Sequence, residues 1–197
     1  MKDSSITNFG LLIAYILPGV TTLWGLSDLV PDIADWLGTR PEDAPTIGGF
    51  LYITLVSVLA GLTVSTLRWI LIDTLHHFTG VSRPNLDFSR FEQSVTAYDT
   101  LIEIHYRYYQ FYANMVVALT IVWAARYLSA SLATGEWNAA AIIFPALILL
   151  FWAGSRDTLR KYYARTGQLL GPGTNGRKAI KHRRQNHPPA RHPSRGD

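Results

Sequence analysis

Long apolar stretches without a charged residue recur four times along the chain. They lie between Asp3 and Asp28, Asp43 and Arg68, Arg107 and Arg126, and Glu136 and Arg156. Each holds about 18 to 24 residues, the length that a helix needs to cross about 30 Å of hydrocarbon at 1.5 Å per residue. The pattern predicts four membrane-spanning helices, at about 6–26, 47–72, 108–128 and 138–155.

The third apolar stretch follows a charged amphipathic segment and a band of tyrosines. From Phe91 to Tyr112, apolar and aromatic residues recur at steps of three and four, which indicates a helix. Tyrosine is typical of the boundary between membrane and water. The sequence therefore predicts one helix of about forty residues, with 87–107 in water and the remainder in lipid.

The second and fourth apolar stretches also continue into polar sequence, which predicts helical extensions at about 73–79 and 156–166. Gly80 and Gly167 follow these extensions, and glycine is common just after a helix end. The expected fold class is all-α, with a four-span transmembrane helical bundle in residues 1–167. Helices 2, 3 and 4 of this bundle extend into the cytoplasm. Residues 168–197 are rich in Gly, Pro and basic residues, which predicts a disordered tail.

Charge is distributed unevenly, although the net charge is only +4. The loop after the first stretch is acidic, with Asp28, Asp32, Asp35, Glu42 and Asp43 against one arginine. Eleven Lys or Arg residues follow Ser155, against two aspartates. Because basic residues favour the cytoplasmic side, both termini are expected there. The expected location is integral to a membrane, such as the bacterial inner membrane.

Polar residues form a stripe on two of the expected spans. Spacings of three and four place them on one face of each helix, at Thr54, Ser57, Gly61, Ser65 and Arg68 on the second and at Glu103, Arg107, Gln110 and Asn114 on the third. Small residues let helices approach closely, and an amide in lipid bonds to a neighbouring helix. The stripes therefore either pack helices together or line a water-filled path.

One cluster of ionisable residues is a weak candidate for a metal site. Asp73, His76 and His77 lie together, and Asp73 and His77 share a helix face at the i, i+4 spacing. The chain has no cysteine, which excludes disulfides and thiolate ligands. It also lacks a nucleophile elbow, a metalloprotease helix and a phosphate-binding glycine loop. The sequence predicts no cofactor, and an enzyme is the least favoured class.

The basic tail carries a dense group of cationic residues. The group comprises Arg177, Lys178, Lys181, Arg183 and Arg184. Such a group is attracted to anionic lipid headgroups near a membrane surface. Nucleic acid is a disfavoured partner, because the tail has no folded reader and no interleaved aromatic residues.

Three functions remain open from the sequence. The first is an oligomeric membrane subunit, expected as a homo-oligomer, which acts as a pore or permeability effector through its polar stripes. The second is a non-conducting membrane anchor or scaffold, whose cytoplasmic helices recruit a cytosolic protein. The third is a metal- or lipid-dependent membrane enzyme at Asp73, His76 and His77.

Overall fold

The computed structural model describes residues 4–37, 47–133 and 139–171, and every regular element in these ranges is helical. In chain order these elements are α1 (Ser4–Leu26), α2 (Pro31–Trp36), α3 (Ile47–Arg68), η1 (Trp69–Asp73), α4 (Thr74–Phe78), η2 (Phe88–Arg90), α5 (Phe91–Leu101), η3 (Ile102–Tyr106), α6 (Arg107–Ala133) and α7 (Ala140–Leu170). Of the short elements, η1 and η3 are π-helical turns and η2 is a 3₁₀ turn. The predicted all-α class is confirmed.

Two long helices contain a π turn without being interrupted by it. One runs through α3, η1 and α4, and the other through α5, η3 and α6. The second corresponds to the single long helix that the periodicity from Phe91 predicted. Neither π turn was foreseen, because the apolar spacing was interpreted with the period of an α-helix throughout.

Two of the helices are long and apolar enough to cross a membrane, namely Ile47–Phe78 and Ala141–Leu170. Only 17 % of the most apolar part of each is buried within the molecule, unlike the core helix of a soluble protein. The apolar part of α1, Leu12–Leu26, is shorter. An all-helical protein with two candidate spans is therefore established, and the four-span bundle stays a prediction.

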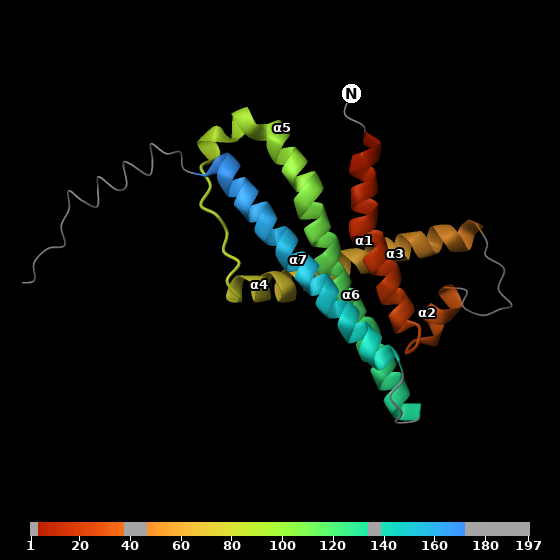
Figure 1. The fold of residues 1–197 in the computed structure, drawn as a ribbon. Helices are drawn as coiled ribbons and strands as arrows, with labels where there is room; N and C mark the ends of the chain where they lie inside the picture. The colour runs from red at the N-terminus through yellow and green to blue at the C-terminus, as the bar shows by residue number, and fades with distance from the viewer. Residues whose placement is uncertain (1–3, 38–46, 134–138, 172–197) are drawn as a thin grey trace, which may run out of the picture.

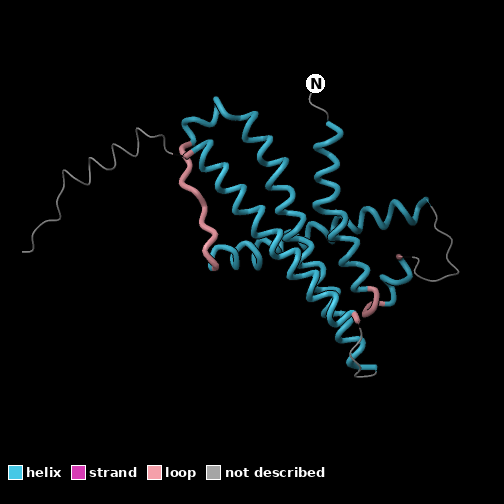
Figure 2. The backbone as a smooth tube through the Cα atoms, in the orientation of Figure 1, coloured by secondary structure: helices cyan, strands magenta, loops and turns pink. Residues whose placement is uncertain are grey.

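The long helices do not all run side by side. In Figure 1, α6 lies beside α7, whereas α3 runs across the direction of α1, α6 and α7. Helix α6 packs against α1, α3 and α7, so it forms the centre of the molecule. The backbone trace in Figure 2 shows the long loop that leads from α4 up to α5, near the end of α7.

The crossing of α1 and α3 brings two backbones into direct contact. A Cβ atom added to Gly61 would lie 2.0 Å from the carbonyl oxygen of Tyr15. One added to Gly19 would lie 1.9 Å from the carbonyl oxygen of Ser57. Only residues without a side chain fit at these two positions, which is how small residues bring helices together in membranes.

A second contact joins α1 to α6 where proline interrupts the α1 backbone. Pro18 has no N–H, so the carbonyl of Ala14, four residues earlier, loses its donor within the helix. The side-chain nitrogen of Asn114 donates to this carbonyl at 2.9 Å, and Asn114 is fully buried. The amide thus satisfies a backbone group that α1 leaves open.

The C-terminal part of α6 contacts the α1 segment through a charged side chain, Arg126. The Nε atom of Arg126 lies 3.3 Å from a carboxylate oxygen of Asp28. Its guanidinium carbon lies 4.1 Å from the centre of the Trp24 ring. Trp24 lies near the end of α1, and Asp28 comes shortly after it. This contact therefore ties the end of α1 to α6.

The two predicted helix ends differ in outcome. At α4, Gly80 has a φ of 92°, its N–H donates to His77 and the Val81 N–H donates to His76, which is the expected glycine cap. In contrast, α7 continues through Gly167 to Leu170. The Asp87 N–H donates to the Leu170 carbonyl at 2.6 Å, so the loop after Gly80 supports the extra turn.

The α1–α3 crossing yields a first prediction. Replacing Gly61 by Ala should destabilise the protein by about 1–3 kcal/mol, because the added methyl group meets the Tyr15 carbonyl. The matched control is Gly48→Ala, since a Cβ there meets nothing within 4 Å. Alanine favours helix over glycine at both positions, so only packing separates them. Thermal unfolding in detergent, followed by circular dichroism, measures the difference, and equal loss in both variants would contradict the crossing.

Candidate functional site

The polar stripes of α3 and of the η3–α6 segment both meet α1. On α3, Ser57 and Gly61 are buried, and both lie at the crossing with α1. On α6, Asn114 bonds to Ala14, and the Gln110 side-chain nitrogen lies 3.4 Å from the Tyr15 hydroxyl. Three buried members of the stripes, Ser57, Gly61 and Asn114, are therefore engaged in packing against α1.

The remaining members of the stripes are spread over different surroundings. Arg107 lies against Gly10 of α1, Glu103 is half-buried on η3, and Ser65 is half-buried on α3. The Thr54 hydroxyl donates to the Phe50 carbonyl of its own helix at 2.8 Å. Arg68 is the last residue of α3, and its side chain bonds to Asp73 of η1.

Arg68 belongs to a buried ion pair at this end of α3. Its Nη1 atom donates to Asp73 Oδ1 at 2.9 Å, and the two side chains are only 5 % and 16 % exposed. The same oxygen accepts a hydrogen bond from the hydroxyl of Tyr109 on α6. The Arg68 guanidinium also lies 5.4 Å from the centre of the Tyr109 ring. Buried charges require such partners, because losing the water around them is costly.

The π turn explains why Arg68 and Asp73 meet. In an α-helix, neighbours on one face are three or four residues apart, whereas a π turn relates residue i to residue i+5. Arg68 and Asp73 are five residues apart, and η1 fills the space between them. The i, i+4 spacing of an α-helix predicts Asp73 beside His77 instead, so the pairing of Asp73 with Arg68 was not predicted.

His76 connects α4 to α7. Its Nε2 atom lies 3.0 Å from the hydroxyl oxygen of Ser155, which itself donates to the Trp152 carbonyl at 2.9 Å. The imidazole packs against the Trp152 ring, with the ring centres 4.4 Å apart and the planes tilted by 34°. His76 and Ser155 are both fully buried. The side chain thus serves as a helix contact at the level of the ion pair.

His77 points to a different set of partners from His76. Its Nδ1 atom lies 2.6 Å from the Asp73 carbonyl, and its Nε2 accepts from Arg83 Nε at 3.2 Å. The structure therefore does not direct Asp73, His76 and His77 toward a common centre. Within the described ranges, no group of three or more histidine, aspartate or glutamate side chains is placed to hold a metal ion.

The sequence did not predict three residues that contact Arg68, Asp73 and His76, namely Tyr109, Trp152 and Ser155. Tyr109 was assigned to the boundary tyrosines, while Trp152 and Ser155 were assigned to the apolar fourth stretch. All three lie where a predicted span meets its predicted extension, and this position is the one signal that pointed to them. Their partners, Arg68, Asp73 and His76, come from α3, η1 and α4, which no local pattern reveals.

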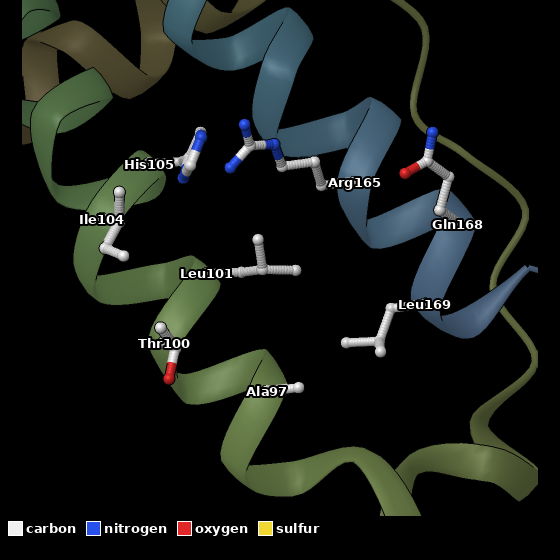
Figure 3. Close-up of a pocket in the computed structure, with 8 residues that line it drawn as sticks. All are labelled: Ala97, Thr100, Leu101, Ile104, His105, Arg165, Gln168 and Leu169. Carbon is white, nitrogen blue, oxygen red and sulfur yellow. The ribbon is translucent and has the colours of Figure 1, made fainter.

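A groove lies between α5 and η3 on one side and the end of α7 on the other. Its volume is about 480 Å³, and it is lined by Ala97, Thr100, Leu101, Ile104, His105, Arg165, Gln168 and Leu169. Figure 3 shows Leu101 and Leu169 facing one another across it, with the Arg165 guanidinium directed toward His105. The groove therefore combines an apolar floor with a cationic rim.

His105 is 7 % exposed, and its Nδ1 atom has no hydrogen-bond partner of normal geometry among the described residues. Burial lowers the pKa of this imidazole below its ordinary 6.5, and the positive charges of Arg165 and Lys161 lower it further. The side chain is therefore neutral near pH 7, and Arg165 supplies the charge at this part of the rim.

The five cationic residues proposed to contact lipid, from Arg177 to Arg184, lie outside the described residues. The described part of α7 nevertheless carries its own basic surface, with Arg160, Lys161 and Arg165 exposed. A single exposed acid on this helix, Asp157, pairs with Lys161 at 2.6 Å. The end of α7 is therefore positively charged before the tail begins.

No protein-family model, no curated protein and no solved structure matches this chain. The function is therefore inferred from the geometry of its own side chains.

The buried ion pair yields a second prediction. Asp73→Asn should destabilise the protein by about 3–5 kcal/mol, because Arg68 would keep its charge without a buried partner. The control is Asp157→Asn, whose pair with Lys161 is more than half exposed and contributes about 0.3–0.5 kcal/mol. Thermal unfolding in detergent compares the two, and an Asp73 variant as stable as its control would refute the burial of this pair.

The lowered pKa of His105 yields a third prediction. Between the ordinary pKa of 6.5 and the lower folded value, the unfolded chain binds a proton that the folded chain does not. The free energy of unfolding should therefore fall as the pH decreases below 6.5, and His105→Gln should remove this part of the slope. Unfolding measured from about pH 7.5 to about pH 5.5 gives both slopes. Parallel profiles for the two proteins would contradict the assignment.

Proposed function

We propose that this protein is an integral membrane anchor or scaffold that holds a cytosolic partner on a helical stalk, defined as α5, η3 and the end of α7. Large apolar side chains on α3 and α7 support the membrane part of the proposal. Phe50, Leu55, Ile142 and Leu149 are each more than half exposed. Contact of such a surface with lipid tails costs no free energy, whereas its exposure to water is unfavourable.

The topology follows from charge. We propose four spans, with α1 and α6 as the remaining two, because both are predominantly apolar and α6 is enclosed by α1, α3 and α7. The stalk carries the exposed polar residues Glu92, Arg160 and Gln168, so it lies in water. Its basic α7 end and the basic tail favour the cytoplasmic side, which also puts both termini there.

The groove of Figure 3 is the observation that carries the scaffold proposal. Leu101, Ile104 and Leu169 supply apolar contacts, and Arg165 supplies charge at the rim. An amphipathic helix fits such a groove by placing its apolar face inward. Arg165 lines the groove, and Lys161 lies near enough to His105 to affect its pKa, so the helix that complements this rim is acidic.

The oligomeric pore is the second proposal, and one surface of α3 favours it. Leu51, Leu55, Leu59 and Leu62 are exposed at helical spacing, so they form an apolar row that a second copy can cover. Such a pore would run between copies, because Ser57, Gly61 and Asn114 are enclosed within one chain. The scaffold has more support, since its groove is complete in a single chain.

The groove yields a fourth prediction. A peptide of about eighteen residues, with leucines on one helix face and glutamates on the other, should bind the purified protein in detergent. Arg165→Glu and Leu101→Glu should each weaken binding by about tenfold or more, by reversing the rim charge or by placing a charge on the apolar floor. Fluorescence anisotropy of the labelled peptide measures the affinity.

The controls use the same helices outside the groove. Arg160→Glu on α7 and Val95→Glu on α5 are exposed and do not line it, so they should leave the affinity nearly unchanged. Equal weakening by all four variants would indicate only general charge attraction. Ion flux through vesicles that contain the protein, together with no peptide binding, would favour the pore over the scaffold.

A further inference from the structure

A second recess lies beside the stalk. This cavity measures about 480 Å³ and is bordered by η1, the loop after Gly80, the α5–η3–α6 helix and α7. Its lining includes Trp69, Asp73, Arg83, Tyr98, Tyr106 and Tyr162. It shares none of its lining residues with the groove of Figure 3.

Tyrosine rings form much of its wall. The ring centres of Tyr106 and Tyr162 are 5.2 Å apart, and those of Tyr162 and Tyr163 are 5.7 Å apart. The hydroxyls of Tyr98 and Tyr162 lie 3.1 Å from one another. Ring faces carry negative charge density, so a wall of this kind attracts an ammonium group.

Both π turns border this cavity. Trp69 and Asp73 stand at the ends of η1, and Ile102 and Tyr106 stand at the ends of η3. Such turns recur at functional sites, because they redirect side chains that an α-helix would place elsewhere. The Thr166 hydroxyl also lines the cavity, is 1 % exposed and has no hydrogen-bond partner of normal geometry among the described residues.

The charges of the lining select the class of ligand. Asp73 is already neutralised by Arg68, while Arg83 is exposed and uses its Nε atom on His77. The Arg83 guanidinium also has a hydrogen bond with the Tyr163 hydroxyl. A guanidinium has five N–H donors in one plane, so those that remain can receive a phosphate. A phosphate at Arg83 and an ammonium among the tyrosine rings together describe a zwitterionic headgroup.

The surroundings favour a lipid as the source of that headgroup. Trp69, Ile70 and Leu71 are more than half exposed and form an apolar surface beside the cavity. Acyl chains can follow this surface when the headgroup occupies the cavity. This step rests on the proposed membrane location of α3, although not on the proposed partner groove.

We propose that the cavity binds the headgroup of a zwitterionic phospholipid, of the phosphoethanolamine or phosphocholine class. The phosphate pairs with Arg83, and the ammonium lies against the rings of Tyr106 and Tyr162. The lipid then fills the space between α3, the loop after Gly80 and the stalk, and so joins the stalk to the membrane.

The test uses the full chain in nanodiscs made of equal parts phosphatidylethanolamine and phosphatidylglycerol. After transfer to detergent, native mass spectrometry counts the lipids that each chain retains. One phosphatidylethanolamine per chain is expected. Arg83→Gln and Tyr106→Leu should each reduce its retention by about tenfold, the effect of losing one interaction with a charged group. Arg160→Gln, outside the cavity on the exposed face of α7, should retain it.

One further variant separates the contribution of a tyrosine ring from that of its hydroxyl, and the exposure of Arg83 guards the test against misfolding. Tyr162→Phe keeps the ring and should keep the ethanolamine lipid, whereas Arg83 is exposed, so Arg83→Gln should fold normally. Retention that is unchanged in Arg83→Gln and Tyr106→Leu would overturn the proposal. Preferential retention of phosphatidylglycerol that Arg160→Gln also abolishes would overturn it in favour of general charge attraction.

Free phosphoethanolamine identifies the source of the headgroup. If it displaces the retained lipid only at concentrations about a hundredfold higher than those of a short-chain lipid, the acyl contacts are confirmed. Displacement at equal concentration would overturn the lipid as occupant and indicate a soluble phosphorylated amine. Binding of the acidic peptide is unaffected in either case, so failure here differs from failure of the scaffold proposal.

Discussion

The carboxylate of Asp73 is the constraint on which this end of the molecule depends. It lies between the Arg68 guanidinium and the Tyr109 hydroxyl, so it joins the end of α3 to α6. A charge with so little contact with water must be compensated by groups already in place. The π turn in η1 satisfies this requirement, because it brings Arg68 within 2.9 Å of Asp73 while leaving His76 directed toward α7.

Helix α1 has the corresponding role in the rest of the molecule. It presents Gly19 to α3 and the open carbonyl of Ala14 to α6, so two helices that cross one another are held by a third. Proline and glycine weaken isolated helices. Here a neighbouring helix compensates both. Gly19 lets the α3 backbone approach closely, and Asn114 donates the hydrogen bond that Pro18 cannot.

The groove and the cavity are consequences of one arrangement. Both are lined by residues of the α5–η3 segment and of the end of α7. Successive residues of η3 face different recesses, with His105 in the groove and Tyr106 in the cavity. The two proposed sites therefore use the same helices without sharing a lining residue.

The sequence alone determined what depends on neighbours along the chain. Apolar periodicity located the helices, small residues marked the face of α3 that meets another helix, and Gly80 marked a helix end. The direction of α3, the π turns, and the partners of Asp73 and Asn114 were decided only by the tertiary structure. Asn114 finds its acceptor one hundred residues away, and the carboxylate of Asp73 is held by the hydroxyl of Tyr109 from another helix. Such terms involve residues that no local spacing connects.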